Sequence, residues 1–420
     1  MVIASLASLS NRDKLKKVAR QMDPVTNPYS PGAGSPPPEL AGRDKVREQA
    51  RIAVARIKIG NPAKSLLMVG LRGVGKTVLL DKIRQDAEAA GMETMRMEAP
   101  EERSLPALLA PQLRLALLKL SRVEHAKAVA QRGLRALAGF AKALKVKFGD
   151  IEVGYDFDPE PGLADNGDLE GDLTALLEQA GNAAKSAGTA LVIFIDELQY
   201  VEEDQFAALI TALHRCSQLS LPLTVVGAGL PQLRGLAGRA KSYAERLFEY
   251  PMIGALADVD AALALTKPAR EQNVEFTDAA IAAIISQTHG YPYFLQEWGK
   301  HAWDIASESP ITETIVLEAS KQAIAALDES FFRVRFDRLT QAEKKYLRAM
   351  AELGPGPHRS GDIAELMSRE SSSLGPVRST LIGKGMVWSP TFGDTAFTVP
   401  LFDEFMKRII PDWTKPIPKG

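Results

Sequence analysis

Residues 70–77, with the sequence GLRGVGKT, limit the fold of this chain more than any other segment. They follow an apolar run at 65–69 that is expected to be a buried strand, and they precede a helical pattern over 77–90. Glycines in such a loop let backbone N–H groups close around phosphate oxygens, and the helix N-terminus adds a positive dipole. A strand, a glycine-rich loop and a helix in this order predict a phosphate-binding loop (P-loop) in a parallel α/β sheet.

The P-loop predicts a site for ATP and magnesium. We expect Lys76 to reach the β- and γ-phosphates of ATP and the Thr77 hydroxyl to coordinate magnesium. The other residues expected to bind the nucleotide belong to the loop and the start of its helix, namely Gly70, Gly73, Val74, Gly75 and Val78.

A second motif fits the first. Five apolar residues at 191–195 are typical of a strand buried on both faces of a parallel sheet, and Asp196 and Glu197 follow directly. Asp196 at the strand end is expected to hold magnesium, as in other P-loop enzymes. Glu197 is placed to take a proton from an attacking water, which is the role of a general base.

Charge and cysteine content exclude several classes of protein. The 420 residues carry 51 Lys and Arg against 52 Asp and Glu, which excludes a surface that is basic all over. A single cysteine, Cys216, excludes an internal disulfide and a cysteine-based zinc site, and it fits a reducing compartment. No apolar run approaches the roughly 20 residues of a membrane span, so we expect a cytoplasmic protein without a membrane partner.

The pattern of elements divides the chain into four parts. Residues 1–38 end in a stretch rich in Pro, Gly and Ser and are expected to be a flexible arm. Residues 39–252 alternate strands and helices, which predicts the α/β core. Residues 253–330 are wholly helical and are expected to form a lid, and residues 331–420 have a pattern of their own.

An insertion of helices and a β-hairpin is expected within the core at about 106–160, with the hairpin at 145–153. Residues 112–147 hold nine Lys and Arg and one acid, whereas residues 150–178 hold ten acids and no Lys or Arg. The two blocks either pair with each other or mark a surface loop. The basic block, with Arg132, Arg135 and Lys142, is one candidate surface for DNA.

The C-terminal part predicts a winged helix-turn-helix. Helices are expected at 341–353, 360–367 and 373–384, followed by a hairpin of residues 386–388 and 396–399. In the DNA-reading version the third helix enters the major groove, and Arg378 and Lys384 are the residues expected to contact DNA. From residue 333 onward the chain has 14 Lys and Arg against 10 Asp and Glu, and this modest excess also fits a module that binds protein.

Taken with an all-helical segment downstream, the two motifs resemble those of the AAA+ and STAND ATPases, nearest to the archaeal and bacterial ATPases related to the origin-recognition proteins. This resemblance implies an AAA+-like core, a helical lid and a winged helix. It also implies that Arg43 lies beside the adenine, that Pro292 lies against the base, and that Arg246 acts as an arginine finger toward a neighbouring subunit. Related ATPases have a polar residue, called the first sensor, at the strand end that matches residues 227–231. This chain has none there, so weak turnover is expected.

The leading interpretation is a molecular switch that binds ATP, hydrolyses it slowly and binds double-stranded DNA through its winged helix. Nucleotide-dependent homo-oligomers are expected if Arg246 acts between subunits. The alternative is a STAND-type signalling or defence ATPase whose winged helix makes only protein contacts. A nucleotide-binding scaffold with almost no turnover is the third interpretation.

Overall fold

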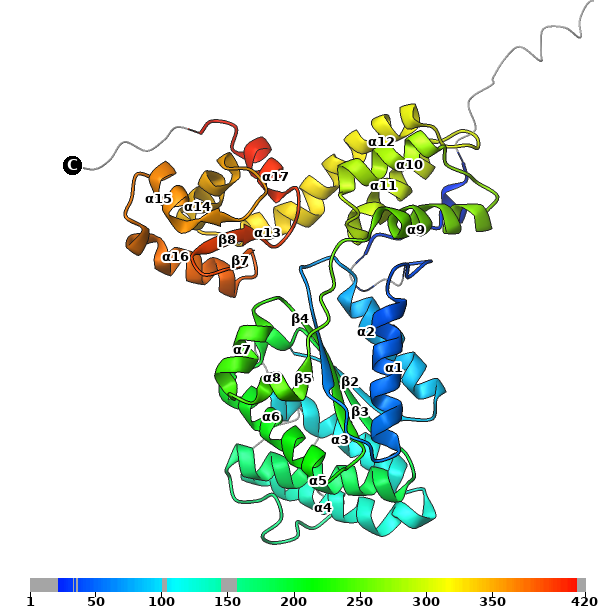
Figure 1. The fold of residues 1–420 in the computed structure, drawn as a ribbon, viewed down its shortest axis with the longest axis vertical. Coiled ribbons are helices and arrows are strands. Elements are labelled where there is room, and N and C mark those ends of the chain that lie inside the picture. The colour runs from blue at the N-terminus through cyan, green and yellow to red at the C-terminus, as the bar shows by residue number, and fades with distance from the viewer. Residues whose placement is uncertain (1–21, 33, 35–36, 100–103, 145–156, 414–420) are drawn as a thin grey trace, which may run out of the picture. The chain divides into compact units, whose positions relative to one another are not determined.

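The computed structural model describes residues 22–32, 34, 37–99, 104–144 and 157–413 (Figure 1). The chain divides into two compact units, one of residues 42–254 with 335–420, and the other of residues 1–41 with 255–334. We call residues 42–254 the core, residues 335–420 the C-terminal module, and the second unit the lid unit.

Five parallel strands form the central sheet of the core, in the order β2-β3-β4-β1-β5 (Figure 1). Every residue of β1, β3 and β4 is buried, as expected for strands covered by helices on both faces. The predicted parallel α/β core is therefore confirmed. The strands are β1 Ser65–Val69, β2 Glu93–Glu98, β3 Leu191–Asp196, β4 Leu223–Gly229 and β5 Phe248–Glu249.

The register of the strands brings the two sequence motifs to one edge of the sheet. Val69 at the end of β1 lies opposite Gly229 at the end of β4, and Ile195 of β3 lies opposite Gly227 of β4. Because ligands of open α/β sheets bind outside the carboxyl ends of the strands, this edge is the expected place for a nucleotide.

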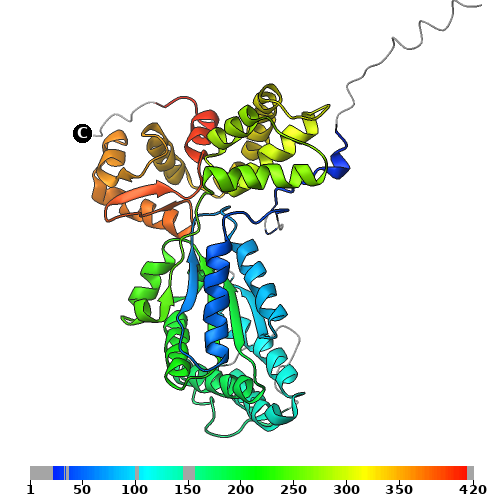
Figure 2. The ribbon, with the colours of Figure 1, turned by 45° about the vertical axis from the view of Figure 1, so that its right-hand side comes forward.

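Helices cover both faces of the sheet, with α1 and α2 on one side and α6 to α8 on the other (Figures 1 and 2). Their buried faces are mostly Ala and Leu, whose small and medium side chains allow close packing against the strands. The helices are α1 Asp44–Lys58, α2 Lys76–Ala89, α3 Leu105–Leu120, α4 Lys127–Ala143, α5 Leu169–Ser186, α6 Glu203–Gln218, α7 Leu233–Ala240 and α8 Ala244–Leu247, with short 3-10 turns η2 Glu124–Ala126 and η3 Leu198–Tyr200.

The helical part of the predicted insertion is present as α3 and α4, whereas the hairpin expected at 145–153 lies outside the described residues. The basic block at 112–147 and the acidic block at 150–178 form ion pairs with each other at Glu160. Arg132 and Arg135 of α4 lie 2.9 and 3.8 Å from the carboxylate of Glu160. This part of the basic block is therefore partly neutralised within the chain.

The lid unit is helical, as predicted, with α9 Asp258–Glu271, α10 Asp278–Thr288, α11 Pro292–Ile305, α12 Glu313–Ala326 and the π-helical turn η4 Leu327–Phe332. Its core is aromatic, because Phe294, Trp298 and Trp303 of α11 are almost fully buried. Within the described parts of the chain, no helix is both long and apolar enough to cross a bilayer.

The expectation of a flexible arm is wrong for residues 22–32, which we call the strap and which include the short helix η1 Pro24–Thr26. Tyr29 of the strap is 3% exposed, and its hydroxyl donates to the carbonyl of Leu265 in α9. Its ring occupies the space over Gly299, where an added Cβ would lie 2.7 Å from the ring. Trp303 donates from Nε1 to the carbonyl of Asp23 at 3.2 Å. Burial of one aromatic ring fixes a segment whose composition alone favours disorder.

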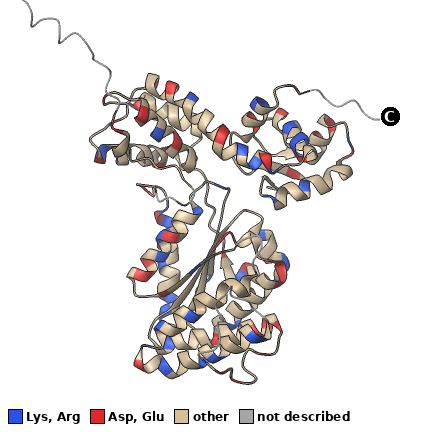
Figure 3. Ribbon diagram, turned by 180° about the vertical axis from the view of Figure 1, so that it is seen from behind, with Lys and Arg blue, Asp and Glu red and all other residues tan. Residues whose placement is uncertain are grey.

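The C-terminal module contains the elements expected from the sequence in the expected order. They are α14 Gln341–Glu352, β6 His358–Arg359, α15 Ser360–Leu366, α16 Ser371–Gly383, β7 Val387–Trp388 and β8 Asp394–Phe397, and α17 Phe402–Ile409 follows; α13 Arg333–Asp337 leads in. The predicted capping box at the start of α14 is present, with Thr340 and Glu343 bonding each other's backbone N–H groups. Lys and Arg are mixed with Asp and Glu over this module and are not gathered by sign (Figure 3).

Candidate nucleotide-binding site

The P-loop joins β1 to α2, and its glycines stand where the backbone conformation or the space disfavours a side chain. Gly73 and Gly75 have φ of 81° and 86°, a left-handed conformation that favours glycine. A Cβ on Gly70 would lie 2.1 Å from the carbonyl oxygen of Ile253. The backbone can therefore take the compact course that turns N–H groups toward a phosphate.

Lys76 begins α2 inside this loop. It is only 6% exposed, and its Nζ donates to the carbonyl oxygens of Gly70 at 3.0 Å and Leu71 at 2.8 Å. Burial lowers the pKa of Lys76 to about 8, and the nearby carboxylates of Glu197 and Asp196 oppose this shift only in part. The lysine is held in the loop by weak neutral acceptors, which phosphate oxygens would replace with charged ones.

Thr77 and Asp196 meet across the edge of the sheet. The Thr77 hydroxyl hydrogen-bonds the Asp196 carboxylate, which is 2% exposed. Burial is the main cause that raises the pKa of Asp196 above its usual range. A hydroxyl beside a buried carboxylate is an oxygen donor set that suits Mg²⁺, which prefers one or two protein oxygens with water and phosphate oxygens. These two residues therefore fit the metal expected from the sequence.

Glu197 follows Asp196 in an uncommon backbone conformation. Its φ of 53° and ψ of 36° lie in the left-handed region, which is rare for a residue with a side chain. Its N–H donates to Oδ1 of Asp196 at 2.9 Å, so the turn is held by the neighbouring carboxylate. Strained residues of this kind cluster at functional sites because the surrounding structure must hold them in place.

Arg43 contacts the loop from the start of α1. It is 8% exposed, and its Nη2 donates to the carbonyl oxygens of Val74 at 3.2 Å and Gly254 at 2.6 Å. The residue thus joins the P-loop to the segment that follows β5. Val78 lies in the first turn of α2, and Pro292 is the first residue of α11 in the lid unit.

The end of β4 carries no polar side chain, in agreement with the sequence. A Cβ on Gly227 would lie 2.3 Å from Cδ1 of Leu198, and a Cβ on Gly229 would lie 2.8 Å from Oε1 of Gln199. Gln199, which fills the space over Gly229, and Tyr200 beside it were not predicted from the sequence. The Tyr200 hydroxyl accepts a hydrogen bond of 2.7 Å from Nη2 of Arg72 in the P-loop. The only sequence signal for them was their position just after Glu197.

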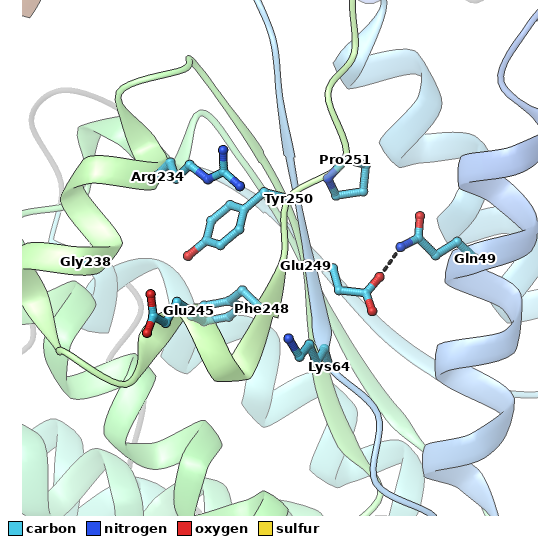
Figure 4. Close-up of a pocket in the computed structure, with 9 residues that line it drawn as sticks. All are labelled: Gln49, Lys64, Arg234, Gly238, Glu245, Phe248, Glu249, Tyr250 and Pro251. Carbon is cyan, nitrogen blue, oxygen red and sulfur yellow. Dashed lines mark hydrogen bonds between the residues drawn. The ribbon is translucent and has the colours of Figure 1, made fainter. Parts of the chain in front are cut away.

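Arg246 lies on α8 and is exposed. Among the described residues its side chain has no ion pair, and Glu249, three residues further on, accepts a hydrogen bond from Gln49. Figure 4 shows a pocket lined in part by Glu245, the residue before Arg246, where the Arg234 guanidinium lies 5.3 Å from the ring centre of Tyr250. No lining residue of this pocket belongs to the P-loop or to the Asp196-Glu197 turn.

Both residues predicted to contact DNA are engaged within the C-terminal module. Arg378 donates from Nε to Oγ1 of Thr395 at 2.7 Å, and from Nη2 to Oγ of Ser389 and the carbonyl of Asp394, both at 2.8 Å. Lys384 lies 2.8 Å from the carboxylate of Glu343. Arg378 therefore holds the hairpin on α16, and Lys384 closes α16 on α14.

Comparison with known proteins agrees with this geometry. The family model of the AAA ATPase domain matches residues 39–226, and a model described as a domain of unknown function matches residues 329–406. No curated protein matches the chain.

Among solved structures, the Walker-type ATPase PABY2304 of Pyrococcus abyssi is similar, at 14% identity and a TM-score of 0.58 over 88% of this chain and 96% of that one. The RuvB Holliday junction branch migration motor of Thermotoga maritima has 17% identity and a TM-score of 0.44, over 91% of this chain and 100% of that one. The Orc1 protein of Aeropyrum pernix in complex with DNA has 16% identity and a TM-score of 0.44, over 89% and 94%. The first of these similarities concerns the fold alone. The P-loop and the acidic strand end both lie within the residues that match the model of the AAA ATPase domain.

Proposed function

We propose that this protein is a molecular switch that binds ATP with magnesium and hydrolyses it slowly. The observation that carries the proposal is the placement of Lys76 in the P-loop, with Thr77 against Asp196 at the same edge of the sheet. Lys76 binds the β- and γ-phosphates, and Thr77 and Asp196 hold the metal. When bound, magnesium neutralises phosphate charge. Glu197 orients the attacking water and accepts its proton.

Slow turnover follows from what surrounds the phosphate. Since Gly227 and Gly229 leave no polar side chain on the end of β4, one expected contact to the γ-phosphate is absent from that strand. Arg246, exposed on α8, supplies positive charge to the phosphoryl group of a neighbouring copy. Hydrolysis then requires at least a dimer, and the homo-oligomer forms with nucleotide bound.

The switch works through a difference in ATP affinity between conformations. ATP shifts the population only if it binds one arrangement of core and lid more tightly than another, and Pro292 of the lid unit is the residue proposed to contact the base. Arg43, bonded to the Val74 carbonyl, supports the P-loop beside the adenine.

For the C-terminal module we propose duplex DNA as the partner. Arg359 and Arg369 are exposed and have no ion pair among the described residues, so they remain available to phosphates. Arg378 and Lys384 can contact DNA in two ways. Either their bonds within the module break, or they use N–H groups that those bonds leave unused. The engagement of these two residues is the observation that favours the second candidate, a module that binds protein.

Two measurements test these proposals. Lys76→Ala should abolish ATP binding, and an unchanged affinity would remove the central claim. For DNA, a duplex should bind with a steep salt dependence, and Arg359→Ala with Arg369→Ala should flatten the log–log slope by up to about 1.8, near 0.9 for each phosphate contact. The matched variant Arg378→Ala with Lys384→Ala tests the residues predicted from the sequence.

The outcomes separate three surfaces. If neither pair matters but loss of Arg132, Arg135 and Lys142 removes binding, the basic block of the core is the DNA surface. If no duplex binds even at low salt, the protein-binding switch is the better interpretation. Sizing the protein with ATP, with ADP and without nucleotide, each with and without duplex, tests the oligomer in the same samples.

A further inference from the structure

The side chain of Gln199, in the turn η3, joins the ends of two strands. Its Oε1 accepts the backbone N–H of Leu230, just after β4, at 3.0 Å. Its Nε2 donates to Oε2 of Glu197, just after β3. The orientation of the amide is fixed by its partners, because a backbone N–H can only donate and a carboxylate can only accept. One side chain therefore links the carboxylate of Glu197 to the loop at the end of β4.

The glycines of β4 make room for this link. A Cβ on Gly229 would lie 2.8 Å from Oε1 of Gln199 and 2.9 Å from Cδ2 of Leu233. The polar group that the end of β4 lacks is thus supplied to the same space by the segment after β3. A side chain on β4 and the Gln199 amide exclude one another there.

We propose that Gln199 is a positioning residue for Glu197 and takes the place of a polar residue on β4. The amide holds one carboxylate oxygen, and this fixes the side chain so that the other oxygen is directed to the attacking water. In the step it serves, the water oxygen bonds to the γ-phosphorus as the bond from that phosphorus to the bridging oxygen breaks. The water proton passes to Glu197, and ADP leaves with the bridging oxygen. This inference rests on the proposed hydrolysis.

The hydrogen bond from Leu230 to Gln199 also connects Glu197 to the loop after β4. Leu230 follows β4 directly and Leu233 begins α7, so a displacement of this loop moves the acceptor side of the Gln199 amide. Such a displacement changes the position of the Glu197 carboxylate through two hydrogen bonds. The base is thereby coupled to the loop that borders the phosphate edge of the sheet.

Two substitutions at one position test the proposal. Gln199→Ala removes both bonds, and kcat should fall by about 10- to 100-fold with the ATP dissociation constant unchanged, because a misplaced group costs rate and not affinity. Gln199→Glu keeps an acceptor for Leu230 but removes the donor to Glu197. Its kcat should fall as well, again with the ATP dissociation constant unchanged, because the Glu197 carboxylate loses the donor that holds it.

The control is Gln85→Ala, an exposed glutamine of α2 that bonds Asp81 and should leave kcat as in the wild type. If Gln199 only supported the β4 loop, Gln199→Glu would keep the wild-type kcat, and the proposal would be overturned. Wild-type kcat in Gln199→Ala would overturn it too. Absence of magnesium-dependent turnover in the wild type would instead remove the proposed hydrolysis, and this inference with it.

Discussion

ATP binding should take up a proton at mildly alkaline pH, because Lys76 is buried in the P-loop. Burial lowers the pKa of its ammonium group to about 8, so the lysine is roughly half neutral at pH 8. Phosphate oxygens beside Nζ favour the charged form and return the pKa to about 10.4 or above. Binding should then take up roughly half a proton at pH 8 and about 0.9 at pH 9, but almost none from this group below pH 7.

The same shift predicts how the affinity changes with pH. Since Lys76 must gain its proton to bind phosphate, the dissociation constant of ATP should rise about tenfold from pH 7 to pH 9, or about 1.4 kcal/mol. Calorimetry in buffers of different ionisation enthalpy gives the proton number directly, as the slope of binding enthalpy against buffer enthalpy.

Two variants isolate Lys76 as the source of the proton. Lys76→Arg carries a charge that does not titrate in this range, so any binding that remains should show no uptake from this position. Lys82→Ala removes a lysine of the same helix that pairs with Asp86 at 3.1 Å, and the proton number should stay as in the wild type. An affinity constant within twofold from pH 7 to 9, with no proton taken up at pH 8.5, would refute the reasoning.

Other substitutions test the remaining parts of the molecule. Glu197→Gln should keep ATP affinity and lower phosphate release by at least about 100-fold, and a wild-type rate would place the base elsewhere. Arg246→Ala should keep the affinity of the isolated subunit and remove any rise of kcat with protein concentration; if the wild type shows no such rise, no finger acts between subunits. Tyr29→Ala should destabilise the lid unit by about 3–5 kcal/mol in urea unfolding, and an unchanged midpoint would show that the strap does not contribute to folding. Thr340→Ala should cost about 1 kcal/mol through its lost helix cap, without a change in ATP affinity.

Local patterns made the strands and the loop around Lys76 predictable. A run of five apolar residues before Asp196 is typical of a buried strand. Glycines at the required spacing predict the loop before Lys76. Both predictions depend on neighbours in the sequence. The residues they placed at one edge of the sheet are brought together there, with the Thr77 hydroxyl on the Asp196 carboxylate.

Contacts between distant segments were not predictable in the same way. Tyr29 and Leu265 are separated by 236 residues, and nothing near Tyr29 in the sequence shows that a ring fits over Gly299. The roles of Arg378 also depend on a fold, because its partners lie on the hairpin that follows α16. The sequence does not show whether a basic residue on the third helix contacts phosphate or holds the hairpin that follows.

Because of the strap, the start of the family match and the start of the folded lid unit are different positions in this chain. The match to the AAA ATPase domain begins at residue 39, yet the lid unit needs Tyr29 to fill the space over Gly299. A shortened chain that begins at the family boundary would keep the whole P-loop and lose the ring that seals α11. It would expose apolar surface of Phe276 and Trp303, whose rings lie 6.3 and 6.5 Å from that of Tyr29. The segment recognised as a family is therefore smaller than the segment that must be expressed to obtain an intact protein.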